Sequence, residues 1–266
     1  MSVFKLGILI PLKSKQVSGD WSLVQACLLR VLNAINNQTA NSFECVVVGH
    51  EEPEDFKINE ICKNTEFVVF DEFEPPDTNK YSGAELQLKY EFDRCSKIAK
   101  GMMTLNSKGI SHWFALDADD LLRSDFVATV ESLKHASAIV LDKGYFYFER
   151  YNIVNTTSEF SSYCGSSCVV SSQINNVPVD LDSFAFKTTF FGSVSHVRVK
   201  EKLTSDNIDF IIPEDRLVMY VRGTGENISQ YYVAGWFAKL KQYIKMRIKR
   251  IIFSKNEFRI FGFNVP

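Results

Sequence analysis

Three carboxylates stand within four residues in the segment Asp117-Ala118-Asp119-Asp120. The apolar run over residues 112–116 comes directly before them and is typical of a buried strand. Crowded, partly dehydrated carboxylates repel one another, which raises the cost of ionisation. Mn²⁺ or Mg²⁺ removes that cost, because these ions favour carboxylate oxygens and leave sites for phosphate. The cluster therefore predicts a divalent cation bound together with a diphosphate; an acidic turn that caps the next helix is the alternative.

The residues before the cluster carry the pattern of a scaffold that would position it. Residues 6–12 and 43–48 are short apolar runs typical of buried strands, and residues 67–70 are a third. Between the first two, residues 21–37 carry apolar side chains at helical spacing. This order predicts an α/β fold with a doubly wound, mostly parallel sheet. Ligands of such sheets bind beyond the carboxyl ends of the strands, where the cluster also falls.

The remaining elements are expected at intervals along the chain. Helices are predicted over residues 84–105 and 125–135, the second capped by Ser124. Strands are predicted over residues 139–141, 144–148 and 218–221. Residues 155–172 are rich in serine and threonine and are predicted to form loops.

Composition excludes several classes of protein. A net charge of −2 gives no overall basic field for nucleic acid, so no nucleic-acid partner is expected. The six cysteines match no zinc-module spacing and are expected to be reduced and buried. The N-terminal residues lack a signal-peptide pattern, and no apolar run approaches the ~20 residues of a spanning helix. We therefore expect a cytoplasmic protein.

The sequence resembles GT-A glycosyltransferases, in particular bacterial family-2-like enzymes. The residues that carry the resemblance are Ile8-Leu9-Ile10-Pro11, Leu116-Asp117-Ala118-Asp119-Asp120-Leu121 and the spacing between them. Asp93-Arg94-Cys95-Ser96-Lys97, Cys164-Gly165-Ser166-Ser167 and Gly225-Glu226-Asn227-Ile228-Ser229 support it. The resemblance implies a GT-A domain over residues 1–229, followed by a C-terminal helix and tail over residues 230–266.

The resemblance also implies a nucleotide-sugar donor, expected to be a UDP-sugar, with Mn²⁺ or Mg²⁺ as cofactor. Asp117 and Ala118 would lie near the ribose, Asp117 also near metal-bound water, and Asp119 would ligate the metal. The nucleobase pocket would include Pro11 and Lys13, with Glu51 contacting the base. Such enzymes often carry an aspartate there, so the segment Val48-Gly49-His50-Glu51 departs from the pattern.

Two further groups of basic residues are assigned by the same resemblance. Arg94 and Lys97 are three residues apart and share a helix face, where they could neutralise the diphosphate; a solvated basic face is the alternative. Many family members have a histidine near the glycine-rich turn as a metal ligand, whereas Thr224 stands there in this chain. His196 is the candidate substitute, although a lone histidine often has a structural role.

The catalytic base has several candidates. An inverting transferase needs a carboxylate that deprotonates the acceptor hydroxyl. Asp180 and Asp182 follow the Gly-Ser-Ser segment, and the pair Glu214-Asp215 is a rival. Any of these could instead be a solvated loop charge, and a retaining enzyme would need no such base.

Residues 231–253 mix basic and apolar side chains at helical spacing and predict a basic amphipathic helix. This helix could make peripheral contact with an anionic membrane, which would suit a lipid-linked acceptor, or it could pack on the protein itself. We expect transfer of a sugar to a glycan or lipid-linked acceptor in bacterial surface polysaccharide synthesis. The alternatives are a nucleotidyltransferase that makes nucleotide sugars and a non-catalytic glycan-assembly protein.

Overall fold

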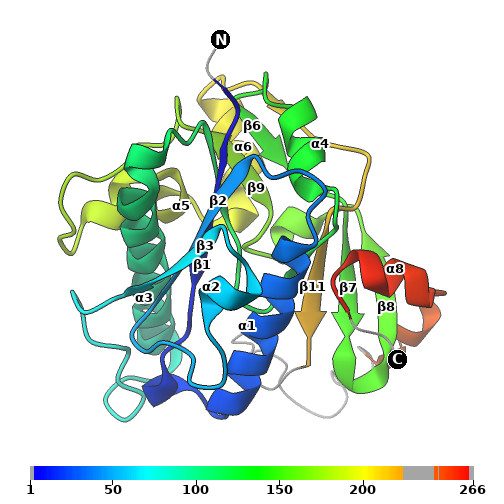
Figure 1. The fold of residues 1–266 in the computed structure, drawn as a ribbon, viewed down its shortest axis with the longest axis horizontal. Coiled ribbons are helices and arrows are strands. Elements are labelled where there is room, and N and C mark those ends of the chain that lie inside the picture. Colours follow the sequence, from blue (N-terminus) through cyan, green and yellow to red (C-terminus); the bar gives the residue numbers. More distant parts are fainter. Residues whose placement is uncertain (1–2, 224–242, 245, 264–266) are drawn as a thin grey trace.

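The computed structural model describes residues 3–223, 243–244 and 246–263. Two sheets form its framework: a seven-stranded sheet in the order β10-β6-β9-β4-β1-β2-β3 and a five-stranded sheet in the order β12-β8-β7-β11-β5. Helices cover both faces of the larger sheet, with α3 on one side and α1 on the other (Figure 1). The predicted α/β class with a mostly parallel sheet is confirmed.

The larger sheet is parallel except for one strand. β1 pairs in parallel with both β2 and β4, so the strand order reverses at β1. β9 lies antiparallel between β4 and β6. The strands are β1 (Leu6–Pro11), β2 (Phe43–Gly49), β3 (Thr65–Val69), β4 (His112–Ala115), β6 (Ala138–Val140), β9 (Cys168–Ser171) and β10 (Phe210–Ile211).

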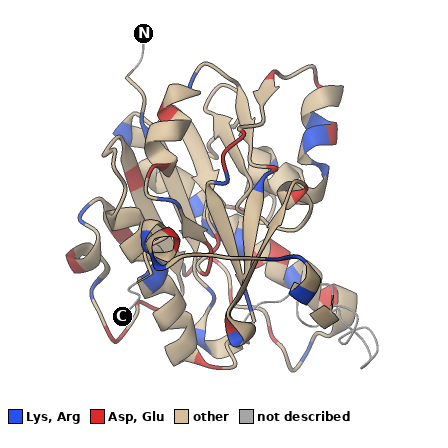
Figure 2. Ribbon diagram, turned by 90° about the vertical axis from the view of Figure 1, so that its right-hand side faces the viewer, with Lys and Arg blue, Asp and Glu red and all other residues tan. Residues whose placement is uncertain are grey.

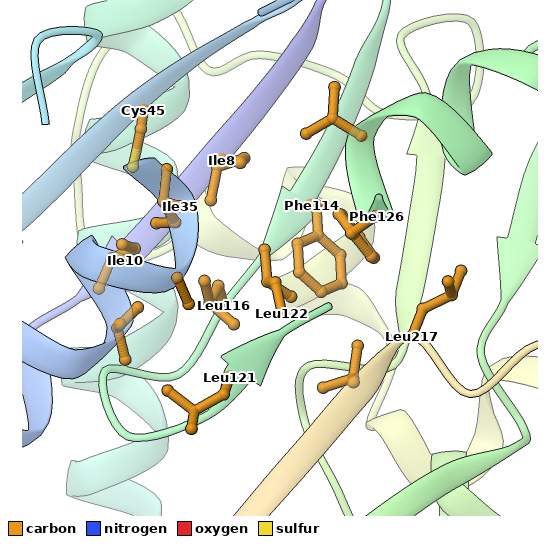
Figure 3. Packing of buried hydrophobic residues seen from close by; sticks show 14 of the residues in the cluster. Ile8, Ile10, Ile35, Cys45, Phe114, Leu116, Leu121, Leu122, Phe126 and Leu217 are labelled. Carbon is orange, nitrogen blue, oxygen red and sulfur yellow. The ribbon is translucent and has the colours of Figure 1, made fainter. Parts of the chain in front are cut away.

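Successive apolar side chains of β1 point to opposite faces of the sheet, and each set packs against a different helical layer. Ile8 and Ile10 pack with Ile35 of α1 (Trp21–Asn36), as Figure 3 shows. Leu9 points to the opposite face, in a second core cluster with residues of α3 (Gly83–Leu105). Every one of these side chains is almost completely buried. The strand that ends at the predicted site is therefore fixed from both sides by the hydrophobic effect.

The smaller sheet joins the larger one through the acidic turn. Its strands are β5 (Leu121–Leu122), β7 (Gly144–Phe148), β8 (Ile153–Thr157), β11 (Val218–Arg222) and β12 (Arg250–Ile251). β5 follows the turn directly and pairs antiparallel with β11. The shorter helices are α2 (Ile58–Ile61), α4 (Phe126–Ser132), α5 (Phe190–Ser193), α6 (Val199–Ser205) and α8 (Lys255–Ile260).

Three local predictions differ from the structure. Residues 155–172, predicted as loops, contain β9 and the end of β8, because these short runs become strands only by pairing with their neighbours. Helix α4 is shorter than predicted, and Asp125 rather than Ser124 is its N-cap residue. The predicted C-terminal helix falls largely outside the described residues; the described positions 243–244 and 246–248 are helical, whereas Arg250–Ile251 form a strand that pairs with β8.

Other expectations agree with the described residues. All six cysteines are free and buried, as predicted. Within the described ranges, no helix is long and apolar enough to cross a membrane. Basic and acidic residues are interspersed over the elements drawn in Figure 2, as the balanced composition suggests.

Candidate functional site

A cavity of about 230 Å³ lies where the strand order reverses, beyond the carboxyl ends of β1 and β4. In open α/β sheets this switch point is the usual place for a ligand. Residues that follow β1, one face of α3 and the acidic turn form its wall. Among the lining residues are Pro11, Lys13, Tyr90, Arg94, Ala118 and Asp119.

Asp120 holds the acidic turn in place and faces inward. Its carboxylate accepts hydrogen bonds from Ser166 Oγ at 2.7 Å and from Cys164 Sγ at 3.0 Å. Ser166 Oγ in turn accepts the backbone N–H of Asp117 at 2.9 Å. Burial and the neighbouring carboxylates raise the pKa of Asp120 well above its usual range. Asp120 is therefore a structural residue of the turn, whereas Asp117 and Asp119 line the cavity.

Asp117 forms an ion pair with Arg94 of α3. Arg94 Nε donates to Asp117 Oδ1 at 2.8 Å, and Arg94 Nη2 lies 2.7 Å from the same oxygen. Gly165 passes directly over the pair: a Cβ at this position would lie 2.6 Å from Arg94 Nη2 and 2.9 Å from Asp117 Oδ2. The glycine therefore permits a close approach that any larger residue would obstruct.

Asp119 is the cavity-lining carboxylate of the turn whose pKa is clearly shifted. Burial and the nearby charge of Asp117 raise its pKa to about 7, although Lys13 and Arg30 oppose the rise. In the metal-free protein about half of the Asp119 side chains would carry a proton near neutral pH. A cation placed here would favour the ionised form of Asp119.

Lys97 and Asp93 form a buried ion pair at the cavity floor. Lys97 Nζ donates to Asp93 Oδ2 at 2.7 Å and to the carbonyl of Leu12 at 2.9 Å, while His50 Nε2 lies 3.0 Å from Asp93 Oδ1. The Lys97 side chain is completely buried. Lys97 lines the cavity, but its charge already serves Asp93 and the end of β1, so its expected role in neutralising a diphosphate stays a prediction that this pairing does not favour. Its burial rules out the alternative of a solvated basic face at this residue.

Glu51 supports the cavity wall from behind and does not line it. Its carboxylate accepts Ser14 Oγ and the backbone N–H of Lys15, each at 3.0 Å. These bonds order the loop that carries Lys13. Glu51 is not among the residues that line the cavity, so its position does not favour the expected contact with a nucleobase; Asp93 does line the cavity.

His196 lies beside a second cavity of about 350 Å³, which shares Asp117 and Arg94 with the first. Burial lowers the pKa of His196, and the charge of Asp117 partly opposes this shift. Across the described residues, no three His, Cys, Asp or Glu side chains are grouped as a metal site. Asp117, Asp119 and His196 therefore do not form a preassembled metal centre.

The three predicted catalytic carboxylates lie outside both cavities. Asp180 and Asp182 are exposed, and Asp182 accepts the backbone N–H of Phe184 at 2.7 Å. Asp215 is 57% exposed and pairs with Arg123 at 3.2 Å. The structure does not bring these residues to the site, because the loops that carry them turn toward solvent.

Two tyrosines belong to the site although the sequence analysis did not select them. Tyr90 and Tyr220 line both cavities. Tyr90 lies four residues before Arg94, so one helix face carries both, and that spacing was a usable signal. Tyr220 comes from β11 of the other sheet, and its approach depends on tertiary structure alone.

No protein-family model matches this sequence, and none of the curated proteins matches it significantly. Staphylococcus aureus TarS resembles its structure with a TM-score of 0.47 and 10% identity over 82% of this chain, which spans only 37% of TarS. The TarS 1–349 fragment in complex with UDP gives 0.46 and 10% over 82% of this chain and 60% of the fragment. A Desulfovibrio desulfuricans G20 protein described as a candidate nucleotide-diphospho-sugar transferase gives 0.43 and 10% over 94% of this chain and all of that one. Likenesses this distant support no inference about activity.

Proposed function

We propose that the protein is a glycosyltransferase that uses a nucleotide-diphosphate-sugar donor, with a UDP-sugar as the first candidate. The observation that carries the proposal is the acidic turn at the strand-order reversal, with Asp117 and Asp119 on the wall of a cavity. Lys13 brings positive charge to the same wall, where Arg94 is paired with Asp117. A nucleoside diphosphate offers an apolar base face, hydroxyl groups and concentrated negative charge, which match the three kinds of surface in this cavity.

The lining offers a different surface to each part of a nucleoside diphosphate. Pro11, Leu12 and Val24 provide apolar contacts, and the Asp93–Lys97 pair lines the same cavity. Asp93 can accept a hydrogen bond from a base N–H without losing Lys97, since a carboxylate has about four acceptor positions. In the proposed binding mode Asp117 and Ala118 would contact the ribose, and Lys13 and Asp119 would face the diphosphate; all four residues line the cavity.

The described residues fit a divalent cation that is shared between protein and ligand. Asp119 lines the cavity and offers one carboxylate, whose pKa is raised by burial and by the nearby charge of Asp117. Asp117 is the other candidate, although Arg94 already neutralises it. Mg²⁺ and Mn²⁺ typically combine one or two carboxylates with substrate phosphates and water. A bound cation would stabilise the charge that develops on the departing diphosphate.

We propose other residues than Asp180, Asp182 and Asp215 for deprotonating the acceptor hydroxyl. Glu91 and His196 both line the second cavity and are the described titratable groups there that can accept a proton from a hydroxyl without breaking an ion pair shown in the structure. We propose one of them as the base of an inverting reaction. Glu91→Gln and His196→Gln should separate the two, because only the true base should lower kcat strongly while leaving donor binding intact.

The proposal is tested by titrating UDP and UDP-sugars into the protein by calorimetry, with and without Mn²⁺ or Mg²⁺. Binding should require the cation, and Asp119→Ala should abolish it while the melting temperature of the unliganded protein stays close to the original. Asp215→Ala is the matched control, because it removes a carboxylate outside both cavities.

Two results would redirect the proposal. Full UDP binding and transfer by Asp119→Ala would refute the metal assignment. Release of pyrophosphate from a nucleoside triphosphate and a sugar phosphate would instead identify a nucleotidyltransferase. A bacterial surface polysaccharide as product, a lipid-linked acceptor and peripheral membrane contact are further proposals; the helix invoked for membrane contact lies largely outside the described residues.

A further inference from the structure

The second cavity continues the first one across a shared wall. Tyr90, Arg94, Asp117 and Tyr220 line both spaces. A ligand in the second cavity would therefore lie against the opposite side of the Arg94–Asp117 pair from a ligand in the first. If the first holds the donor, as proposed above, the second is where the other reactant meets it.

The lining of the second cavity combines aromatic rings with polar groups. Tyr163, Phe190 and Tyr220 supply rings, while Gln87, Ser195 and His196 supply hydrogen-bonding groups. An alkyl chain would leave these polar groups dehydrated and unpaired, which is costly. A pyranose ring has an apolar C–H face and a rim of hydroxyl groups, so it can satisfy both parts of this lining.

The aromatic surface extends beyond the cavity along the smaller sheet. Tyr220 pairs with Phe146 and Arg222 pairs with Phe148 across β11 and β7, so these four side chains share one face. Phe146 lies 6.0 Å from Tyr220 and 5.5 Å from Tyr163 between ring centroids. We call Phe146, Phe148, Tyr163, Tyr220 and Arg222 the aromatic face.

Side chains on the two faces of β7 have different environments. Tyr145 and Tyr147 point the other way and pack against Phe253, Phe258, Phe261 and Phe263. On the aromatic face, the Arg222 guanidinium lies 5.5–5.9 Å from the ring centroids of Tyr220, Phe148 and Phe146. This stacking holds the rings in a continuous, partly exposed strip that leads into the cavity through Tyr163 and Tyr220.

We propose that the acceptor is a carbohydrate chain, whose terminal pyranose enters the second cavity and whose next residues stack on the aromatic face. The inference rests on the proposed function, since it takes the first cavity as the donor site. Sugar rings are the expected occupant, because the aromatic face continues into the cavity and the mixed aromatic and polar lining suits sugars better than a lipid chain.

Fluorine NMR of protein labelled with 3-fluorotyrosine tests the occupant directly. Glucose, galactose, mannose, N-acetylglucosamine and N-acetylgalactosamine are each added to about 0.1 M, a concentration that fills a millimolar site. At least one should shift the Tyr163 and Tyr220 signals and leave the Tyr151 signal in place. Dihexanoyl phosphatidylcholine, added as monomer, is the lipid probe. No shift with any sugar, or a shift with the lipid alone, would overturn the proposal.

A matched pair of variants tests the role in transfer. Tyr163 and Tyr151 are similarly exposed, at 49% and 46%, and only Tyr163 lines the cavity. With the sugar that gives the largest shift, Tyr163→Ala should weaken binding about tenfold, as loss of a ring contact predicts, while Tyr163→Phe keeps most of it. Tyr151→Ala should bind the sugar normally, and equal losses in the two alanine variants would refute the assignment.

The two hypotheses fail in different ways. UDP binding, measured separately in Tyr163→Ala, should equal that of the unmodified protein, because Tyr163 does not line the first cavity. Absent UDP binding in every protein would reject the donor site whatever the sugars do. Normal UDP binding without any sugar-induced shift would reject only the acceptor assignment.

Discussion

Asp93→Asn provides the sharpest test of the cavity floor, because it removes the partner of a completely buried lysine. Loss of one member of a buried ion pair costs about 3–5 kcal/mol of unfolding free energy. This loss of unfolding free energy has an upper limit, because the variant can fold with Lys97 deprotonated. For an ordinary lysine pKa near 10.4, deprotonation at pH 7 costs about 5 kcal/mol. Asp93→Asn should therefore lose ~4 kcal/mol of unfolding free energy at pH 7.

The same variant should show a characteristic pH dependence. Burial already lowers the pKa of Lys97, and Asp93 partly offsets this shift. Without Asp93 the folded protein binds this proton still less well than the unfolded chain does, so stability must rise with pH. Between pH 7 and pH 9 the deficit of Asp93→Asn should shrink by at most about 3 kcal/mol, at up to ~1.4 kcal/mol per pH unit, because the lowered Lys97 pKa of the parent gives it a smaller rise of the same sign.

Urea unfolding followed by fluorescence measures both effects. Glu72→Gln is the matched control. Glu72 pairs with Lys100, which lies on the same helix as Lys97, and this ion pair is less buried than the Asp93–Lys97 pair. It should cost about 1 kcal/mol or less and show no comparable pH dependence. If Asp93→Asn lost no more stability than Glu72→Gln, or if its deficit were constant with pH, Lys97 would not be held as a charged group by Asp93.

Three further predictions address the acidic turn and the corrected assignments. Gly165→Ala should weaken UDP binding at least about tenfold with little loss of melting temperature, because its Cβ would press on Arg94 and Asp117; unchanged UDP affinity in calorimetry would contradict this. In metal-free protein, the raised pKa of Asp120 makes the stability of the parent fall as pH rises above the pKa of an ordinary aspartate. Asp120→Asn lacks this titration, so between pH 4 and pH 8 it should gain on the order of 1 kcal/mol relative to the parent in thermal unfolding. The double variant Asp180→Asn/Asp182→Asn should keep its transfer rate within about twofold, and a loss above about tenfold would restore these residues as candidates.

The long periodic elements of this fold could be predicted from the sequence. The apolar runs of β1 and β2 and the helical spacing of α1 match strands and a helix that are buried along their length, so their patterns are strong. α3 buries side chains only from Asp93 onward. β9 was missed because four residues among serines carry little pattern. Its strand conformation comes from pairing with β4 and β6, which are distant in sequence.

Site residues that directly follow a strand could be predicted from the sequence. Residues whose role depends on which side chain they pair with in the folded protein could not. The acidic turn and Arg94 reach the cavity as expected. The pairing of Lys97 with Asp93 was not foreseen, because sequence spacing shows which residues share a helix face but not what that face meets. Asp180 and Asp182 failed for a related reason, since the course of an irregular loop has no sequence period.

The two cavities draw on different stretches of the chain. Apart from Tyr220, the residues that line the first come from positions 11–119, whereas most of those unique to the second come from positions 163–199. If the two cavities hold donor and acceptor as proposed, exchange of the later segment between homologous proteins would alter the acceptor while preserving the donor. Recombination near residue 120 would then be a simple route to new products, provided that the four residues common to both linings are kept.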